Sequence, residues 1–183
     1  MISLLARAVL GATLAAATPA PAPTPVPSTA PGPAYDDPGM HVAAPAGWER
    51  VPTDPSAGDA DAPTALFVSK RGTFDQRSLL VQVKPFEGDL SAFERSLESD
   101  FHSHGGAFVK DKTATTLANG MPAYFLRVLL DDPSGHSIQR DEYVVIDGQR
   151  GIEVAYVGRG YDDADARKAL ATLYVVAYPG RHR

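Results

Sequence analysis

The sequence predicts an α/β (α+β) domain in which a single twisted antiparallel sheet is flanked by helices. Apolar residues recur at helical spacing in two segments, 90–101 and 163–173, and alternating strands fill the chain between them. The strand expected at 122–130 is apolar on both faces, which is typical of a central strand that is covered on both sides. Together these patterns predict helices packed on a sheet.

The first 34 residues are expected to precede this domain as an export signal and a tether. Residues 1–17 contain one basic residue, Arg7, a short apolar run and small residues at the end, which is typical of a secretory signal peptide. The run is too short to span a bilayer. Residues 18–34 alternate Pro with Ala, Thr and Ser, which predicts a disordered linker that is either a spacer or a docking segment.

The folded domain is expected to begin at Tyr35 and to occupy residues 35–183. The sequence pattern in the first part of the domain predicts four strands, at 39–43, 48–51, 65–69 and 78–84. Residues 52–63 are rich in Pro, Gly, Asp and Ser and have no periodicity, so they predict a loop.

Asp89 is expected to cap the first helix, and Gly105 and Gly106 to end it. Its buried stripe is expected to hold Leu90, Phe93, Leu97 and Phe101. The charged residues of the helix should point away from the sheet: Glu94, Arg95, Glu98 and Asp100.

Four further strands are expected between the helices, at 108–115, 122–130, 137–146 and 151–157. Asp147 and Gly148 predict a hairpin between the last two. Asp162 or Asp163 is expected to cap the second helix. Its buried stripe would contain Ala166, Ala169, Leu170 and Leu173.

The composition excludes several classes of function. There is no cysteine, so the chain has no disulfide, no thiol nucleophile and no site for amino-terminal lipid attachment. Its 22 acidic residues outnumber its 17 basic ones, which disfavours nucleic acid and anionic membranes as partners. We expect an extracytoplasmic protein, periplasmic or secreted, that is monomeric and has no membrane span.

Three segments occur in a recognisable order. Residues 39–42 lead to Pro-Ala-Gly-Trp at 45–48, residues 117–124 contain Gly-Met-Pro-Ala-Tyr, and a closing strand and helix occupy 151–173. In this order they resemble the PsbP-like superfamily, which includes an extrinsic photosystem II protein, a Ran-binding import factor and bacterial envelope proteins. The resemblance covers about residues 35–178. It implies an α/β/α sandwich, usually non-catalytic, that acts as an assembly or binding accessory.

Trp48 follows a Pro-Ala-Gly turn and is expected in the core, where its indole closes the end of the sheet. A ligand-stacking role is the alternative. Further aromatic side chains are expected to fill the core or, alternatively, to line an apolar cleft: Phe67, Phe74, Phe86, Phe125 and Tyr143.

Candidate metal ligands lack suitable spacing. His102 and His104 lie near Asp100, but residues i and i+2 of a helix diverge by about 200°, so a solvated helix end is expected. Two acidic groups depart from the spacing of a calcium loop: Asp54, Asp59 and Asp61 in the long loop, and Asp162, Asp163 and Asp165 at the second helix.

Candidate catalytic groups are equally weak. Gly158, Arg159 and Gly160 stand between a strand and a helix, but nearby aspartates would repel a phosphate there. Neighbours on a strand face opposite sides, so no relay is expected from His136, Ser137 and Asp141. We therefore assign no catalytic, cofactor-binding or metal-binding residue and expect no enzyme.

Three functions remain open. The first is a non-enzymatic accessory that binds an unknown protein or cell-envelope polymer through a sheet edge or loops. The second is a carrier of a small hydrophobic ligand, which a cavity larger than a few hundred Å³ would favour. The third is a hydrolase without a recognisable motif, which clustered carboxyls with raised pKa values would favour.

We predict that signal peptidase cleaves after Ala17. Ala15 and Ala17 are small, and the residue that follows the cut, Thr18, is not proline. The intact mass of the protein secreted by its native host measures this directly. A mature protein that still begins at Met1 would contradict the prediction.

Overall fold

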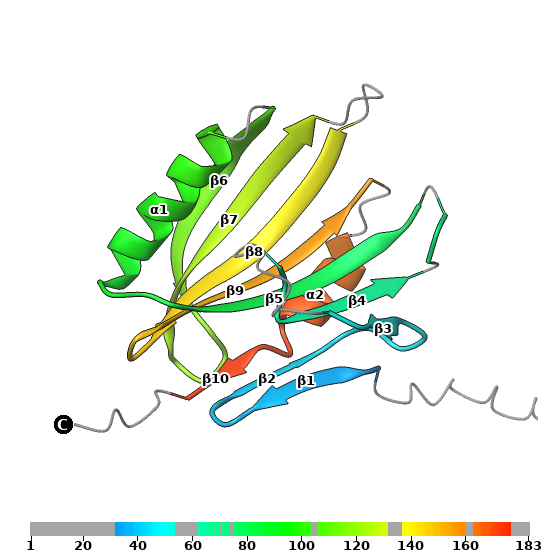
Figure 1. The fold of residues 1–183 in the computed structure, drawn as a ribbon, viewed down its shortest axis with the longest axis horizontal. Helices are drawn as coiled ribbons and strands as arrows, with labels where there is room; N and C mark the ends of the chain where they lie inside the picture. Colours follow the sequence, from blue (N-terminus) through cyan, green and yellow to red (C-terminus); the bar gives the residue numbers. More distant parts are fainter. Residues whose placement is uncertain are drawn as a thin grey trace, which may run out of the picture.

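Seven antiparallel strands form the main sheet (Figure 1). This computed structural model describes residues 32–53, 62–69, 71–73, 75–103, 106–131, 137–159 and 163–176. The strands are β3 (Glu49–Val51), β4 (Ala65–Ser69), β5 (Arg77–Pro85), β6 (Ala107–Thr116), β7 (Pro122–Asp131), β8 (Ser137–Asp147) and β9 (Arg150–Gly158). Their spatial order is β3-β4-β5-β9-β8-β7-β6, so β9 is the central strand.

A second, three-stranded sheet makes the prediction of a single sheet wrong. It consists of β1 (Ala34–Asp37), β2 (Met40–Ala43) and β10 (Tyr174–Val175), in the order β1-β2-β10. The pairing of β10 with β2 joins residues from the two ends of the described chain, such as Tyr174 and His41. The sequence predicted β2 as the strand at 39–43 but neither β1 nor β10, because strands of two to four residues show little periodicity. Only the pairing of distant segments reveals that the three form a separate sheet.

The predicted signal peptide, residues 1–17, lies outside the described residues, as does most of the predicted linker, 18–34. The described part begins at Gly32. The amide of Ala44 donates a hydrogen bond of 2.9 Å to the carbonyl oxygen of Pro33, and β1 starts at Ala34.

Helix α1 (Leu90–Ser103) packs on β6, β7 and β8 and follows the sequence prediction closely. The amide of Ala92 donates to Asp89 Oδ1 at 2.7 Å, which confirms the predicted cap. Phe93 and Leu97 are buried against the sheet, as expected. The prediction for Glu94 is wrong: this side chain is buried, and its carboxylate lies 3.0 Å from Lys112 Nζ on β6.

Helix α2 (Asp163–Leu170) lies against the opposite face of the main sheet. Its buried residues Ala166, Ala169 and Leu170 join the same core as Ile152 and Tyr156 of β9. The helices therefore occupy different faces, but each covers only part of its face, and a complete three-layer α/β/α sandwich is not confirmed. Neither of the two described helices has the length and hydropathy that a membrane span requires.

Strand β7 is interior, as its two apolar faces predicted, although it is second from the edge instead of central. Its residues Leu126 and Val128 pack against α1, while Ala123 faces the core shared with α2. The strand thus separates two apolar clusters, one on each face of the sheet.

Trp48 belongs to the larger core, as predicted. Gly47 has a φ of 81°, and the amide of Trp48 donates to the carbonyl oxygen of Pro45 at 3.3 Å, so the chain turns sharply before the indole. The Trp48 side chain is only 8% exposed, and its ring centroid lies 5.7 Å from that of Tyr156 on β9. This contact ties the turn before β3 to the centre of the sheet.

We expect Trp48→Ala to lower the free energy of unfolding by about 3–5 kcal/mol, because it removes a large buried aromatic side chain. Urea unfolding followed by circular dichroism measures the change. Trp48→Phe keeps part of the ring packing and should lose clearly less. Wild-type stability in Trp48→Ala would show that the indole contributes little to the core.

Candidate functional site

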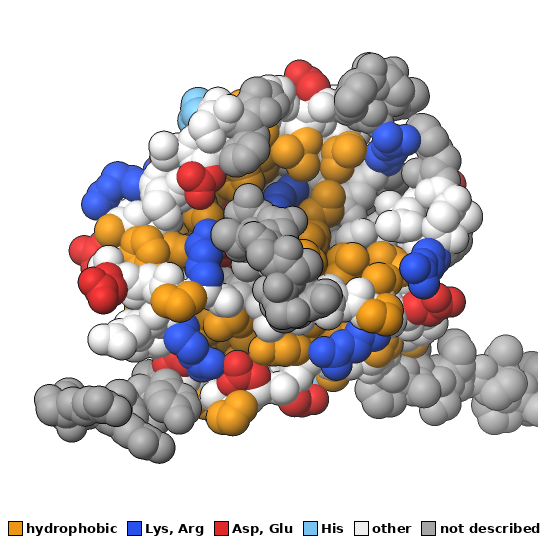
Figure 2. Space-filling model, in the orientation of Figure 1, with side chains coloured by type: hydrophobic (Ala, Val, Ile, Leu, Met, Phe, Trp, Pro, Cys, Tyr) orange, Lys and Arg blue, Asp and Glu red, His pale blue; other side chains and the backbone are white. Residues whose placement is uncertain are grey.

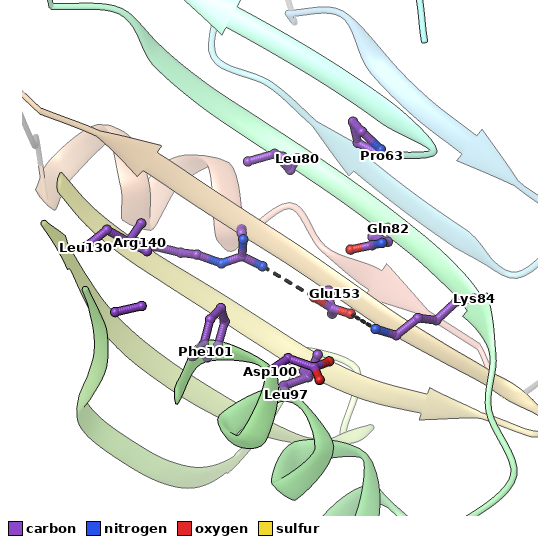
Figure 3. A pocket seen from close by; sticks show the side chains of 12 residues that line it. Pro63, Leu80, Gln82, Lys84, Leu97, Asp100, Phe101, Leu130, Arg140 and Glu153 are labelled. Carbon is purple, nitrogen blue, oxygen red and sulfur yellow. Dashed lines mark hydrogen bonds and ion pairs between the residues drawn. The ribbon is translucent and has the colours of Figure 1, made fainter. Parts of the chain in front are cut away.

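A groove of about 500 Å³ lies on the α1 face of the main sheet, beside the helix (Figure 3). We call it the α1 groove. Helix α1 covers β6, β7 and β8, and the groove lies between its last turns and strand β5, with β9 in the floor. Figure 2 shows hydrophobic side chains on this face with basic ones between them. Its apolar lining includes Leu80, Leu97, Phe101 and Leu130.

Charged side chains cross the floor of the α1 groove in alternating order. Lys84 Nζ on β5 lies 3.0 Å from Glu153 Oε1 on β9, and Arg140 Nη2 on β8 lies 3.3 Å from Glu153 Oε2. Arg140 Nε donates to Glu142 Oε2 at 2.6 Å. Each positive group of the floor therefore neighbours a carboxylate, and Glu142 lies beneath the floor as a second partner of Arg140.

Two aromatic rings hold the cations of this floor in place. Lys84 Nζ lies 5.5 Å from the ring centroid of Phe93, and the guanidinium carbon of Arg140 lies 5.3 Å from that of Phe101. Cations over rings at these distances are attracted by the ring quadrupole. The floor is accordingly pre-organised, with its charges held by neighbours on both the sheet and the helix.

Glu142 is fully buried, with no exposed surface. Burial raises its pKa; Arg140 opposes this increase, while the neighbouring Glu153 adds to it. Glu142 Oε1 has no hydrogen-bond partner among the described residues. A carboxyl with a raised pKa beside a second carboxylate partly meets the criterion for a hydrolase. However, Glu142 does not line the groove, so a substrate there would not reach it.

A second groove, of about 600 Å³, lies on the opposite face between α2 and strands β6, β7 and β8. We call it the α2 groove. The rings of Phe125 and Tyr143 lie edge to face in it, with centroids 5.7 Å apart. Beside them, Arg127 binds Asp141 through two hydrogen bonds, of 2.8 and 2.6 Å. This groove thus combines aromatic rings with a neutral ion pair.

The aromatic residues proposed from sequence divide between core and groove. Phe67 is fully buried, and Phe86 packs against Phe93 with ring centroids 4.7 Å apart. Phe125 and Tyr143 line the α2 groove instead. Phe74 lies outside the described residues.

The candidate metal ligands do not form a site in the described part of the chain. His102 is exposed at the end of α1, and its Nδ1 lies 2.6 Å from the carbonyl oxygen of Glu98. Within the described ranges, no three His, Asp or Glu side chains are grouped so that they could hold one metal ion. Several candidates lie outside those ranges: Asp54, Asp59, Asp61, His104 and Asp162.

The remaining candidates serve other contacts. Asp165 pairs with Arg77 of β5 at 3.1 Å, which joins the start of α2 to the sheet. Asp141 is held by Arg127, while Ser137 is exposed at the start of β8. Gly158 ends β9. Two other members of these candidate groups, His136 and Gly160, lie outside the described residues.

No prediction from the sequence placed a charged floor in the α1 groove. Its signal was present: Arg140 and Glu142 share one face of β8 with the apolar residues Val144 and Ile146, and Glu153 interrupts the buried run of β9. A charged residue inside an apolar strand face requires a partner, and this requirement indicates a polar cluster. Which residues provide the partners depends on strand register.

No family model and no curated protein matches the sequence. Among solved structures, the chain is similar to cyanobacterial PsbP (CyanoP) from Synechocystis sp. PCC 6803, with 17% identity, a TM-score of 0.52, and coverage of 79% of this chain and 92% of that one. It is also similar to LpqN, involved in cell envelope biogenesis of Mycobacterium tuberculosis, with 17% identity, a TM-score of 0.51, and coverage of 75% and 86%. The chain therefore has a PsbP-like fold, as its motifs predicted.

The raised pKa of Glu142 predicts a pH-dependent stability. At pH values between the usual glutamate pKa and the raised pKa of Glu142, the unfolded chain has lost the carboxyl proton and the folded chain retains it. Folding then takes up a proton, so stability falls as pH rises through this range. Glu142→Gln cannot ionise and should flatten this decline. Urea unfolding at a series of pH values measures how steeply the free energy of unfolding falls with pH in the wild type and in Glu142→Gln. The exposed Glu49→Gln is the control. Equal slopes in wild type and Glu142→Gln would refute the assignment.

Proposed function

We propose that the protein is exported and acts outside the cytoplasm as a non-catalytic accessory that binds another envelope component through the α1 groove. The observation that carries the proposal is the part of the sheet face that α1 leaves uncovered, where apolar walls surround a charged floor. The signal-like residues 1–17 and the PsbP-like fold support the location and the accessory role. The similarity to LpqN, an envelope biogenesis protein, agrees with them.

The chemistry of the groove suits binding. Leu80, Phe101 and Leu130 are half-buried, and covering their remaining apolar surface would contribute about 25 cal/mol per Å². Covering the floor adds little desolvation cost, because Glu153 already forms ion pairs with both Lys84 and Arg140. A partner can therefore cover the groove without leaving a buried charge unpaired.

A small-ligand carrier is the second candidate. The volume of the α1 groove, about 500 Å³, lies within the usual range for ligand pockets. Its charged floor favours an amphipathic ligand over a wholly apolar one, because an apolar ligand would remove water from charges without replacing it. A hydrolase has less support, since Glu142 is sealed beneath the surface and Glu153 is held by two cations.

Affinity capture from native envelope extracts tests the accessory role. Leu80→Asp places a charge in the wall of the α1 groove and should abolish capture of the partner. Phe108→Asp is the matched control, because Phe108 is exposed on β6 and lines neither groove. Thermal unfolding confirms that both variants fold. Equal capture by Leu80→Asp and wild type would exclude the α1 groove as the binding surface.

A further inference from the structure

We infer that the α2 groove is a binding site for a neutral saccharide chain. This site lies on the face of the sheet opposite the α1 groove, so the inference does not depend on the function proposed above. It rests on how strand register arranges aromatic, ionic and hydroxyl side chains over β6, β7 and β8.

Two rows of side chains cross these strands. In the first row, Thr113 lies opposite Phe125, which lies opposite Tyr143. In the second, Asp111 lies opposite Arg127, which lies opposite Asp141. The rows are two residues apart along each strand, or roughly 7 Å. A pair of aromatic side chains therefore lies beside a row of hydrogen-bonding groups.

The aromatic row suits the apolar side of a sugar ring. Phe125 and Tyr143 are half-buried and line the groove from adjacent strands, so part of each ring faces its interior. The C–H groups on one face of a pyranose can pack against such rings and displace water from them. The rim of the same sugar carries hydroxyls, which need polar partners.

The second row and the walls supply these partners. Arg127 and Asp141 form a doubly hydrogen-bonded pair, which Gln139 extends by donating from Nε2 to Asp141 Oδ1 at 3.3 Å. Thr113 and Thr115 place hydroxyls along β6, and Arg167 projects from α2. Because a sugar hydroxyl both donates and accepts, it can bond to guanidinium, carboxylate and hydroxyl groups alike.

The charges of the groove favour a neutral ligand. Two carboxylates, Asp111 and Asp141, balance two guanidinium groups, Arg127 and Arg167. A phosphate would face both carboxylates. An acyl chain would remove water from all four charged groups and offer no hydrogen bond in return.

An extended peptide fits the groove less well than a saccharide. The backbones of β6, β7 and β8 pair with one another in the sheet, so the groove offers mainly side chains to a ligand. A peptide bound there would lack main-chain partners for its own N–H and C=O groups. Asp111 and Thr113 are exposed on β6, the last strand of the described sheet, so a chain of several sugars can continue beyond the groove.

Titration of the full-length protein with neutral hexasaccharides, followed by two-dimensional NMR, tests the inference. The panel contains homo-oligomers of glucose, mannose, galactose and N-acetylglucosamine, with sodium dodecanoate and an unstructured neutral hexapeptide as other ligand classes. We expect at least one saccharide to shift the ring signals of Phe125 and Tyr143. Arg167→Ala and Thr113→Val should each weaken its binding about two- to tenfold, the usual effect of losing one hydrogen bond.

Matched controls lie close to each variant. Lys168→Ala removes an exposed cation from the next position of α2, and Thr116→Val removes an exposed hydroxyl from the end of β6; neither residue lines the groove. Both should bind as the wild type does. The inference fails if no saccharide binds at millimolar concentration, or if Arg167→Ala and Thr113→Val both bind like wild type. It also fails if only dodecanoate or the peptide shifts the ring signals.

Discussion

The contact between Phe93 and Gly151 determines how α1 sits on the sheet. A Cβ atom at Gly151 would lie 2.6 Å from Phe93 Cε2 and 2.9 Å from Cε1, so only glycine allows the ring to rest on the central strand. Phe86 packs against the same ring, and Lys84 lies over it. This close approach anchors the start of α1 over β9, while the last turns of the helix form a wall of the α1 groove.

Paired charges occur on both faces of the sheet. On the α1 face, Glu153 joins Lys84 to Arg140, and on the other face Asp141 holds Arg127. At the end of the β8–β9 hairpin, Arg150 bridges Asp147 to Asp37 of β1 and so connects the small sheet to the main one. Because each buried carboxylate of the described residues has a cation beside it, this part of the protein holds charged groups in its interior as pairs.

The sequence predicted both helices because their signals are local. Asp89 caps α1, and the spacing of Phe93 and Leu97 marks its buried side within one continuous segment. The buried position of Glu94 could not be predicted in this way, since its partner Lys112 comes from a strand eighteen residues later. The same limit applies to the candidate sites. The charged residues of β8 and β9 can be recognised in the sequence, but their partners on neighbouring strands cannot.

By itself, therefore, the sequence determined the helices, the long strands, the burial of Trp48 and, through three ordered motifs, the PsbP-like fold. Each of these depends on residues that lie near one another along the chain or on a pattern within one segment. Tertiary structure alone decided the small sheet, the two grooves and the identity of every ion pair across strands. Those features depend on strand order and register, which bring together residues that are far apart in the chain.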